Sequence, residues 1–318
     1  MVMVNGKSAP KVSVCMPVYN GQNFLSETLD AILGQDFEDF ELVVTDNAST
    51  DGTAEILGTR ASQDARIRYI RNPENIGAAA NYNLGFERAR GHYIKWAAHD
   101  DLLSSNFLSR TVDILDRDPE TGIAFGATAF IDEDGQPSEG DGIMPENLSE
   151  DPAVRFRRAL YQGGHSFPIF GLFRAEDLAR TTLHRKYYGS DRALFCEMNL
   201  LGKLRIDPDA TFKYRWHAAQ SVKIADSQQK SIWQGGSAGQ KTELRSLSRV
   251  RHLLEVAGRH PDLASPTVLR WEVAKFAARP SQIGRYGLET IQAIAPNAGN
   301  AVRPMAIDFY SRVKARSR

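Results

Sequence analysis

The stretch KVSVCMPVYN, from Lys11 to Asn20, decides the fold that the sequence predicts. It is rich in β-branched and apolar residues and ends in residues that favour turns, which is typical of a buried strand. The stretch that follows, from Phe24 to Gln35, places leucine and isoleucine side chains at helical spacing. A buried strand that leads into an amphipathic helix is the repeating unit of an α/β protein.

The same unit recurs along the first hundred residues. A second strand ends at Asp46, and the segment after it begins a helix that Asp51 or Thr53 can cap. A third strand, a further helix and a fourth strand follow at 66–72, 78–90 and 92–98. Apolar strands that alternate with helices predict a parallel sheet covered on both faces.

Polar side chains follow each of these four strands. They form clusters at residues 17–20, 46–47, 72–77 and 99–101. In open parallel sheets, ligands bind at the carboxyl ends of the strands, near the point where the strand order reverses. The sequence therefore predicts that the four clusters converge on one crevice.

Beyond residue 120 the pattern becomes mixed. We predict a strand at 122–132, an acidic loop rich in Gly and Pro at 133–152 and another strand at 165–174. From about residue 225, two apolar stripes predict a helical appendage. One stripe carries Leu247 and Leu254, and the other carries Val268 and Trp271.

The bulk composition is that of an ordinary folded protein. Of 318 residues, 42% are hydrophobic and 25% are charged, which disfavours disorder and fibrous repeats. The longest apolar run, from Gly122 to Ile131, is too short to span a bilayer, and the first residues do not resemble a secretory signal. We therefore expect a cytoplasmic protein in which Cys15 and Cys196 are reduced packing thiols.

The formal net charge is zero, but the charge is unevenly distributed. Residues 241–318 contain 14 Lys and Arg against 6 Asp and Glu. This basic end could meet phosphates or an anionic membrane surface, or it could consist of the solvated faces of helices.

Six segments, in order, resemble a known family. They are VSVCMPVYNG, LVVTDNASTDGT, NPENIGAAANYNLGFERARGHYI, HDD, GSDRALFCEM and YRWH, and they cover about residues 11–221. They resemble the signature segments of family 2 inverting glycosyltransferases. The resemblance implies an α/β GT-A nucleotide-diphospho-sugar transferase fold, which has a mixed, mainly parallel sheet flanked by helices. It implies a catalytic domain at 1–224, with a nucleotide-sugar half to about 120 and an acceptor half at 121–224, followed by a helical C-terminal region at 225–318.

The donor side of the expected site would hold a nucleotide-sugar. A base and ribose need a flat apolar contact and a carboxylate acceptor, which Tyr19 and Asp46 offer. Asp46 could instead only form a turn, and capping already explains Asp51. Glycines would let the backbone approach the ligand, although helix packing and turns are their alternative roles. The resemblance implies contacts from Pro17, Val18, Tyr19, Asn20, Asp46, Asn75, Gly77, Asn83, His99 and Asp100.

The two acids after the fourth strand indicate a metal site. A departing diphosphate gains negative charge, which a divalent cation held by carboxylate oxygens stabilises. Family members usually carry Asp-x-Asp-Asp here, whereas this chain has Ala98-His99-Asp100-Asp101. The resemblance implies that Asp100 and the late histidine, His217, bind Mn²⁺ or Mg²⁺, with His99 partly replacing the lost carboxylate. The alternative for His217 is a hydrogen-bonded core residue.

Inverting transfer needs a base that removes the proton of the acceptor hydroxyl. The resemblance implies that this base is Asp191, preceded by Ser190 where the family has a glutamate. The alternative role of Asp191 is helix capping. Glu197, about one and two-thirds helical turns later, should point elsewhere. His165 and Arg174 are candidate contacts to the acceptor.

The expected protein is an enzyme that moves a sugar from a UDP-, dTDP- or GDP-linked donor to a glycan or lipid-linked acceptor, in polysaccharide or glycolipid biosynthesis. One alternative is a sugar nucleotidyltransferase, but PVYNGQNF lacks the basic residues of a phosphate loop. Another is a noncatalytic nucleotide-sugar-binding module, because Ala98 and Ser190 depart from the family pattern. No nucleic acid partner is expected. A homodimer, and peripheral contact with the inner face of the membrane through Trp233, Trp271 and the basic tail, are candidate interactions.

Overall fold

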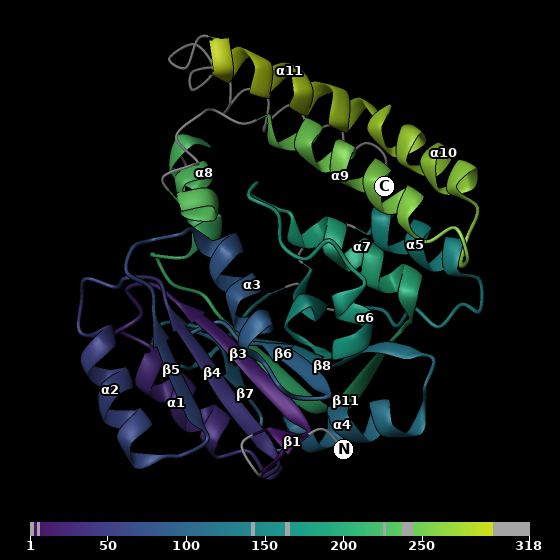
Figure 1. Cartoon of the computed structure of the whole chain (residues 1–318). Helices are drawn as coiled ribbons and strands as arrows, with labels where there is room; N and C mark the ends of the chain where they lie inside the picture. Colours follow the sequence, from purple (N-terminus) through teal and green to yellow (C-terminus); the bar gives the residue numbers. More distant parts are fainter. Residues whose placement is uncertain are drawn as a thin grey trace.

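The computed structural model describes residues 3–4, 7–140, 144–162, 166–224, 227–236 and 244–294. A large twisted sheet lies at its centre with helices against its faces, and a layer of C-terminal helices lies above it (Figure 1). A separate two-stranded sheet consists of β1 (Met3–Val4) and β2 (Lys7–Ser8).

The opening half is built as the sequence predicts. Its strands are β3 (Val12–Val18), β4 (Phe40–Asp46), β5 (Ile67–Arg71) and β6 (Tyr93–Trp96), and its helices are α1 (Leu25–Leu33), α2 (Thr53–Gln63) and α3 (Ala78–Arg88). Strand β3 pairs in parallel with β4 and β6, and β4 pairs in parallel with β5. Every residue of β3 and β4 is buried. Strands covered on both faces explain why these segments are so apolar.

The second half extends the sheet with mixed pairing. Its elements are β7 (Leu102–Leu103), α4 (Phe107–Arg117), β8 (Thr121–Ile131), β9 (Pro137–Ser138), α5 (Pro152–Tyr161), β10 (Leu172–Arg174), α6 (Ala175–Ala179), α7 (Asp191–Leu201) and β11 (Lys203–Arg215). The order across the sheet is β5-β4-β3-β6-β10-β8-β11-β7, with β9 on β8. Strand β10 runs antiparallel to both β6 and β8, whereas β11 runs parallel to β8. The mixed, mainly parallel sheet is confirmed.

Two segments differ from the sequence prediction. The strand predicted at 165–174 is a 3₁₀ helix, Phe167–Phe170, followed by the short β10. Pro168 has no N–H to donate to a strand ladder, which favours the helical turn. The long β11 was not predicted, because its alternating pattern follows α7 after only Gly202 and reads as a continuation of that helix.

Aromatic side chains form much of the core between the sheet and its helices. Trp96 lies 5.8 Å from Phe173 between ring centroids, and Phe107 lies 6.1 Å from Phe125. All four rings are essentially inaccessible to solvent. Burying each side chain of this size contributes roughly 1.5–3 kcal/mol. Cys15 and Cys196 are buried and unpaired, as expected.

The C-terminal region is helical, as predicted. Its helices are α8 (Ser227–Gly235), α9 (Arg245–Arg259), α10 (Pro266–Ala277) and α11 (Pro280–Ile294). The predicted apolar stripes are only partly buried. Leu247, Leu254 and Trp271 are exposed by 44%, 39% and 63%, whereas Ala257 and Phe276, which belong to the same two stripes, are buried. The buried face of α9 also contains polar side chains, so apolar spacing alone does not define it.

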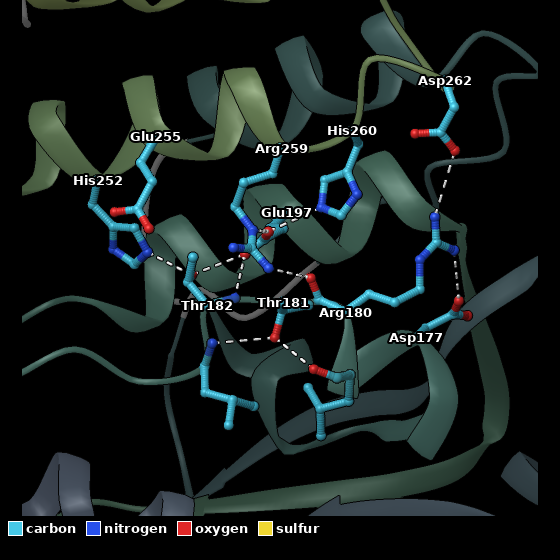
Figure 2. Close-up of polar contacts among 12 residues, drawn as sticks. Asp177, Arg180, Thr181, Thr182, Glu197, His252, Glu255, Arg259, His260 and Asp262 are labelled. Carbon is cyan, nitrogen blue, oxygen red and sulfur yellow. Dashed lines mark hydrogen bonds and ion pairs between the residues drawn. The ribbon is translucent and has the colours of Figure 1, made fainter.

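A polar network joins α9 to α7 and to the segment before it (Figure 2). The fully buried carboxylate of Glu197, on α7, accepts hydrogen bonds from the N–H and hydroxyl of Thr182 and from the side chain of Arg259. His260 Nε2 lies 3.0 Å from Glu197 Oε1, and His252 Nε2 lies 2.6 Å from Thr182 Oγ1. Glu197 therefore has a structural role.

The basic tail beyond residue 294 lies outside the described residues. Within the described ranges, none of the helices has the length and apolar character needed to cross a membrane.

Candidate active site

A cavity of about 680 Å³ opens at the carboxyl ends of β3 and β6. One wall consists of residues that follow β3, β4 and β6, together with the start of α3. The other wall consists of the 3₁₀ helix at 167–170, the start of α7, the segment after β11, and α8. The crevice predicted at the strand ends is therefore present, and it includes a wall from the C-terminal region.

Seven of the ten residues predicted to contact the nucleotide-sugar line this cavity. They are Pro17, Val18, Tyr19, Asn20, Asn75, His99 and Asp100. Tyr19 is 40% exposed, so it offers an open aromatic surface. Asn20 has a φ of 52°, and its side chain accepts a hydrogen bond from the N–H of Thr50 at 2.8 Å. A left-handed asparagine stabilised in this way turns the chain sharply after β3.

Asparagine side chains fix the geometry of the cavity wall at the ends of β4 and β5. Asn47 donates to Asn75 at 2.8 Å, and its own oxygen accepts from Asn72 and from the N–H of Ile76. Asn72 also donates to Asn81, which in turn donates to the carbonyl of Thr45. The network joins the ends of β4 and β5 to α3. Asn47, Asn75 and Asn81 all line the cavity.

The position of Asp46 does not support the predicted nucleotide contact. Its side chain is fully buried and does not line the cavity. One carboxylate oxygen accepts from the N–H of Ser49 at 2.9 Å and the other accepts from the hydroxyl of Tyr69 at 2.9 Å. Burial, followed by this contact with Asp46, raises the pKa of Tyr69 to about 12. Asp46 has the turn-forming role that was its alternative, and Asn47 faces the cavity instead.

Gly77 and Asn83 also lie outside the cavity lining. Gly77 has a φ of 82°, and a Cβ atom added to it would lie 2.3 Å from the backbone nitrogen of Gly236. The backbone of Gly77 therefore packs closely against the end of α8, whereas the sequence had predicted a close approach to the ligand. Asn83 donates to the carbonyl of His184 and accepts from the N–H of the same residue. Both residues lie beside the cavity rather than in its lining, and the contacts predicted for them stay predictions.

The predicted metal ligands, Asp100 and His217, meet at the cavity wall. Their Oδ2 and Nε2 atoms lie 2.8 Å apart, and the ring of Phe24 packs against the imidazole at a centroid distance of 4.7 Å. Burial raises the pKa of Asp100, but His99 and the hydrogen-bonded His217 outweigh it and hold that pKa below its usual range. Asp100 is therefore readily ionised.

The neighbouring acid has the opposite character. Burial and the charge of Asp100 raise the pKa of Asp101 well above its usual range. Asp101 accepts from the N–H of Arg215 at 2.9 Å, while Arg215 Nε donates to the carbonyl of Asp100. The buried guanidinium of Arg215 also donates to Glu27 at 2.6 Å. Asp101 and Arg215 thus support the backbone that presents Asp100.

Asp191 is the first residue of α7 and lines the same cavity. It is partly buried, and Ser190 before it makes no side-chain cap hydrogen bond. Burial raises the pKa of Asp191, and the adjacent charge of Arg192, which also lines the cavity, opposes that shift. A carboxylate with a raised pKa is a stronger base, which suits proton abstraction.

Comparison with known proteins assigns the chain to a family. The model of "Glycosyl transferase family 2" matches residues 13–180, which is more than half of the chain. The chain belongs to glycosyltransferase family 2. An uncharacterized glycosyltransferase of Rickettsia felis is 30% identical over 224 residues, which cover 67% of this chain and 35% of the relative. A GalNAc(5)-diNAcBac-PP-undecaprenol beta-1,3-glucosyltransferase of Campylobacter jejuni is 28% identical over 59% of this chain and 60% of its own length. The chain thus spans only part of the length of these relatives.

Solved structures confirm the GT-A fold of this family 2 glycosyltransferase. TarS of S. aureus in complex with UDP-GlcNAc matches 96% of this chain and 88% of its own chain, with a TM-score of 0.57 and 17% identity. The mannosyltransferase PcManGT of Pyrobaculum calidifontis, in complex with GDP-Man and Mn²⁺, matches 97% of this chain and 83% of its own, with a TM-score of 0.53 and 19% identity. At these identities the likeness extends to the fold alone.

The side chains of this glycosyltransferase fit a divalent cation that shares its coordination with a substrate. A carboxylate oxygen and an imidazole nitrogen are ligands that Mn²⁺ and Mg²⁺ accept. Within the described part of the chain, no group of three or more His, Cys, Asp and Glu could hold a metal ion. Mg²⁺ commonly binds through one or two carboxylates together with phosphates and water. Asp100 and His217 suit such a site, in which diphosphate oxygens complete the coordination.

The two predicted acceptor contacts have different outcomes. His165 lies outside the described residues. Arg174 pairs with Tyr93 at the beginning of β6, which is the end of the strand remote from the cavity. Its guanidinium donates to the carbonyls of Leu115, Asp118 and Thr121. The acceptor contact predicted for Arg174 is wrong, because strand direction places it at the other edge of the sheet.

Asn47 lines the cavity, as expected for the 46–47 cluster at the end of β4, but several other cavity residues were not predicted from the sequence. They include Asn81, Tyr82, His184, Tyr188, Arg192 and Trp233. Asn81 had a usable signal, because it belongs to the NPENIG…NYN segment. Tyr188 and Trp233 had none, because they reach the cavity through contacts between α8 and the loop before α7.

Proposed function

We propose that this family 2 enzyme is an inverting glycosyltransferase that moves one sugar from a nucleoside-diphosphate donor to a hydroxyl of a glycan or lipid-linked acceptor. One observation carries the proposal. A single cavity contains the carboxylate of Asp191, whose pKa is raised, together with the Asp100–His217 pair and an open tyrosine ring at the donor end. These are the groups that base-assisted displacement of a diphosphate requires.

In the proposed reaction, Asp191 removes the proton of the acceptor hydroxyl as its oxygen attacks the anomeric carbon. The bond from that carbon to the diphosphate breaks in the same step, and attack from the opposite face inverts the configuration. Asp191 retains the proton until product leaves. Burial raises the pKa of Asp191, and the charge of Arg192 beside it opposes that shift.

The donor is held at the carboxyl ends of β3, β4 and β6. Tyr19 provides a flat surface for the base, and the fixed amides of Asn47 and Asn75 provide hydrogen-bonding groups beside it. Asp100 and His217 would hold the Mn²⁺ or Mg²⁺ ion. When bound, that ion supplies positive charge that stabilises the departing diphosphate.

The relatives support the class of donor and acceptor. The Campylobacter protein is named for an undecaprenol-linked acceptor, and the two structural neighbours were solved with UDP-GlcNAc and GDP-Man. We extend to this chain a nucleotide-sugar donor and a glycan or lipid-linked acceptor. A cytoplasmic location, with peripheral contact at the inner face of the membrane, would suit such an acceptor. We also keep the division at residue 224 as a proposal.

The first experiment is a thermal-shift panel of UDP-, dTDP- and GDP-sugars with Mn²⁺ or Mg²⁺. A bound donor stabilises the folded protein by mass action. With the selected donor, Asp191→Asn should reduce transfer by about 10²-fold or more while donor affinity is retained. Asp100→Ala should remove the metal-dependent part of donor affinity. The matched control is Asp209→Asn, because Asp209 is 72% exposed and lies outside the cavity lining.

Two results would contradict the proposal. If Asp191→Asn transfers sugar at the rate of the unchanged chain, the base assignment is wrong. If the unchanged chain binds a donor tightly but neither hydrolyses nor transfers it, the chain is a nucleotide-sugar-binding module.

A further inference from the structure

The wall of the cavity opposite its donor residues is unusually apolar for a surface that faces solvent. Val222, Ile232 and Trp233 line it, and they are 39%, 42% and 37% exposed. Large apolar side chains grouped on an open surface are characteristic of a binding site. Because Asp191 lies in the same cavity, a molecule resting on this wall would be close to the proposed base.

Two aromatic rings form the centre of this wall. Tyr188 lies three residues before Asp191, and Trp233 lies on α8. Their ring centroids are 5.9 Å apart and their planes are inclined by 63°. The ammonium group of Lys230 lies 4.7 Å from the centroid of Tyr188, and the guanidinium of Arg245 lies 5.9 Å from it. Cations over an aromatic face hold the ring in position.

Helix α8, which carries Trp233, is hydrogen-bonded to the segment that precedes Asp191. Gln234 donates to the hydroxyl of Ser190 at 3.3 Å and to the carbonyl of Arg185 at 3.2 Å. At the other side, the end of α8 meets the backbone of Gly77 so closely that no side chain fits there. These contacts place the two rings at a defined position relative to Asp191.

The chemistry of the wall selects among possible occupants. Beside the rings it presents the side chains of Ser221, Gln229 and Gln234 and the charged Arg192. A pyranose ring has one face of C–H groups, which pack well on an aromatic face, and a rim of hydroxyls that bond to amides and charges. An alkyl or prenyl chain would pack on the apolar side chains but would bring the charged Arg192, which lines the same cavity, into an apolar environment.

We propose that Trp233, which packs beside Tyr188, stacks against the pyranose ring of the acceptor, so that this enzyme extends molecules that already end in a sugar. This inference rests on the proposed transferase function and specifies the acceptor class for the same site. The rings position the acceptor, and Asp191 acts on the hydroxyl that faces it.

Saturation-transfer NMR on the full chain tests this stacking directly. The probes are the methyl glycosides of glucose, galactose, N-acetylglucosamine and N-acetylgalactosamine. At least one should receive saturation, strongest on the protons of one ring face. Trp233→Ala should weaken its binding about fivefold or more, and Trp233→Phe should retain most of it. Trp271→Ala is the matched control, because that tryptophan is 63% exposed on α10 and outside the cavity lining.

Two further measurements separate the possible failures. Binding of UDP, dTDP or GDP with Mn²⁺ should be unchanged in Trp233→Ala, which shows that the variant is folded and that only the acceptor side has changed. Farnesyl phosphate serves as a lipid probe. The proposal is overturned if no glycoside binding depends on Trp233, or if farnesyl phosphate binding depends on it and glycoside binding does not. If no nucleotide binds even the unchanged chain, the proposed function itself has failed, whatever the glycosides do.

Discussion

His184 shows how burial determines the chemistry of one side chain. It is 8% exposed, and its ring packs against Tyr82 and Trp96 at centroid distances of 4.9 and 4.8 Å. Burial, aided by the nearby His252, lowers the pKa of His184 to about 3. The imidazole is thus neutral in the folded protein throughout the physiological range, whereas in the unfolded chain it takes up a proton below about pH 6.5.

This difference predicts how stability depends on pH. Because the folded-state pKa of His184 lies below the unfolded value, its contribution is constant above about pH 6.5 and stability is lost as the pH falls from there toward 3. Between pH 7 and pH 5 the loss from this site should be about 2 kcal/mol. Urea unfolding of His184→Gln over this range should show a correspondingly smaller loss than the unchanged chain.

The exposed His92 provides the control for this measurement. The variant His92→Gln should follow the pH dependence of the unchanged chain. If His184→Gln and His92→Gln lose stability in parallel between pH 7 and pH 5, then His184 is not held neutral by the fold.

At the scale of elements, the attachment of α9 to α7 depends on one buried carboxylate. Glu197 accepts from Thr182 at 2.8 and 2.9 Å and from Arg259 at 2.9 Å, and it has no exposed surface (Figure 2). Burial opposes its ionisation, but His260 and Thr182 outweigh that effect and hold its pKa below the usual range. The carboxylate charge therefore contributes to the hydrogen bonds and ion pairs that hold α9 against α7.

Replacement of this carboxylate by an amide should weaken the contact between α7 and α9. In Glu197→Gln, an NH₂ group faces donors that previously met an acceptor, so we expect a loss of about 2–3 kcal/mol in the free energy of unfolding. Chemical unfolding followed by circular dichroism measures this loss. The control, Glu255→Gln, breaks an exposed pair between Glu255 of α9 and Arg185, which lies outside the helices, and should change stability by less than about 1 kcal/mol. If the two variants lose equal amounts of unfolding free energy, Glu197 does not stabilise the contact between α7 and α9.

At the scale of the whole molecule, the cavity is completed by segments far apart in sequence. Helix α8 contacts α3, and in Figure 1 it lies between α3 and the end of α11. It contributes Ile232, Trp233 and Gln234 to a cavity whose donor residues come from the first hundred residues. These parts approach each other closely at Gly77, where an added Cβ atom would meet the backbone of Gly236.

A methyl group at Gly77 should therefore displace α8. The residue has a φ of 82°, so Gly77→Ala adds backbone strain to the steric clash, and we expect a loss of about 2 kcal/mol or more. Because α8 carries part of the acceptor wall, sugar transfer should fall more than the affinity for the donor nucleotide. Unfolding measurements, together with separate KM values for donor and acceptor, test both effects.

Gly58 gives a matched control within a helix. A Cβ atom added there meets nothing within 4 Å, so Gly58→Ala should stabilise the protein by about 0.5–1 kcal/mol through its helix propensity alone. If Gly77→Ala were as stable as Gly58→Ala, the contact between α3 and α8 would not constrain the molecule.

The sequence correctly predicted the cavity residues whose position depends only on where a strand ends. The clusters after β3 and β6, with Tyr19, Asn20, His99 and Asp100, line the cavity as expected, since the carboxyl ends of parallel strands share one edge. The sequence could not predict that the side chain of Asp46 is buried while that of Asn47 faces the cavity. Adjacent side chains at a strand end point in different directions, and the hydrophobic pattern does not show which of the two faces the cavity. Arg174 was misplaced because the direction of β10 depends on its pairing with β6.

By itself, the sequence determined the α/β fold, the residues at the strand ends and the order of the family motifs that contain Asp100, Asp191 and His217. These features follow from hydrophobic period, turn residues and spacing, which are local properties of the chain. Only the tertiary structure decided that Asn47 rather than Asp46 faces the cavity, that Glu197 joins two helices, and that α8 lines the cavity. These depend on packing between segments distant in sequence, where shape and hydrogen-bond partners select one arrangement among many with the same local pattern.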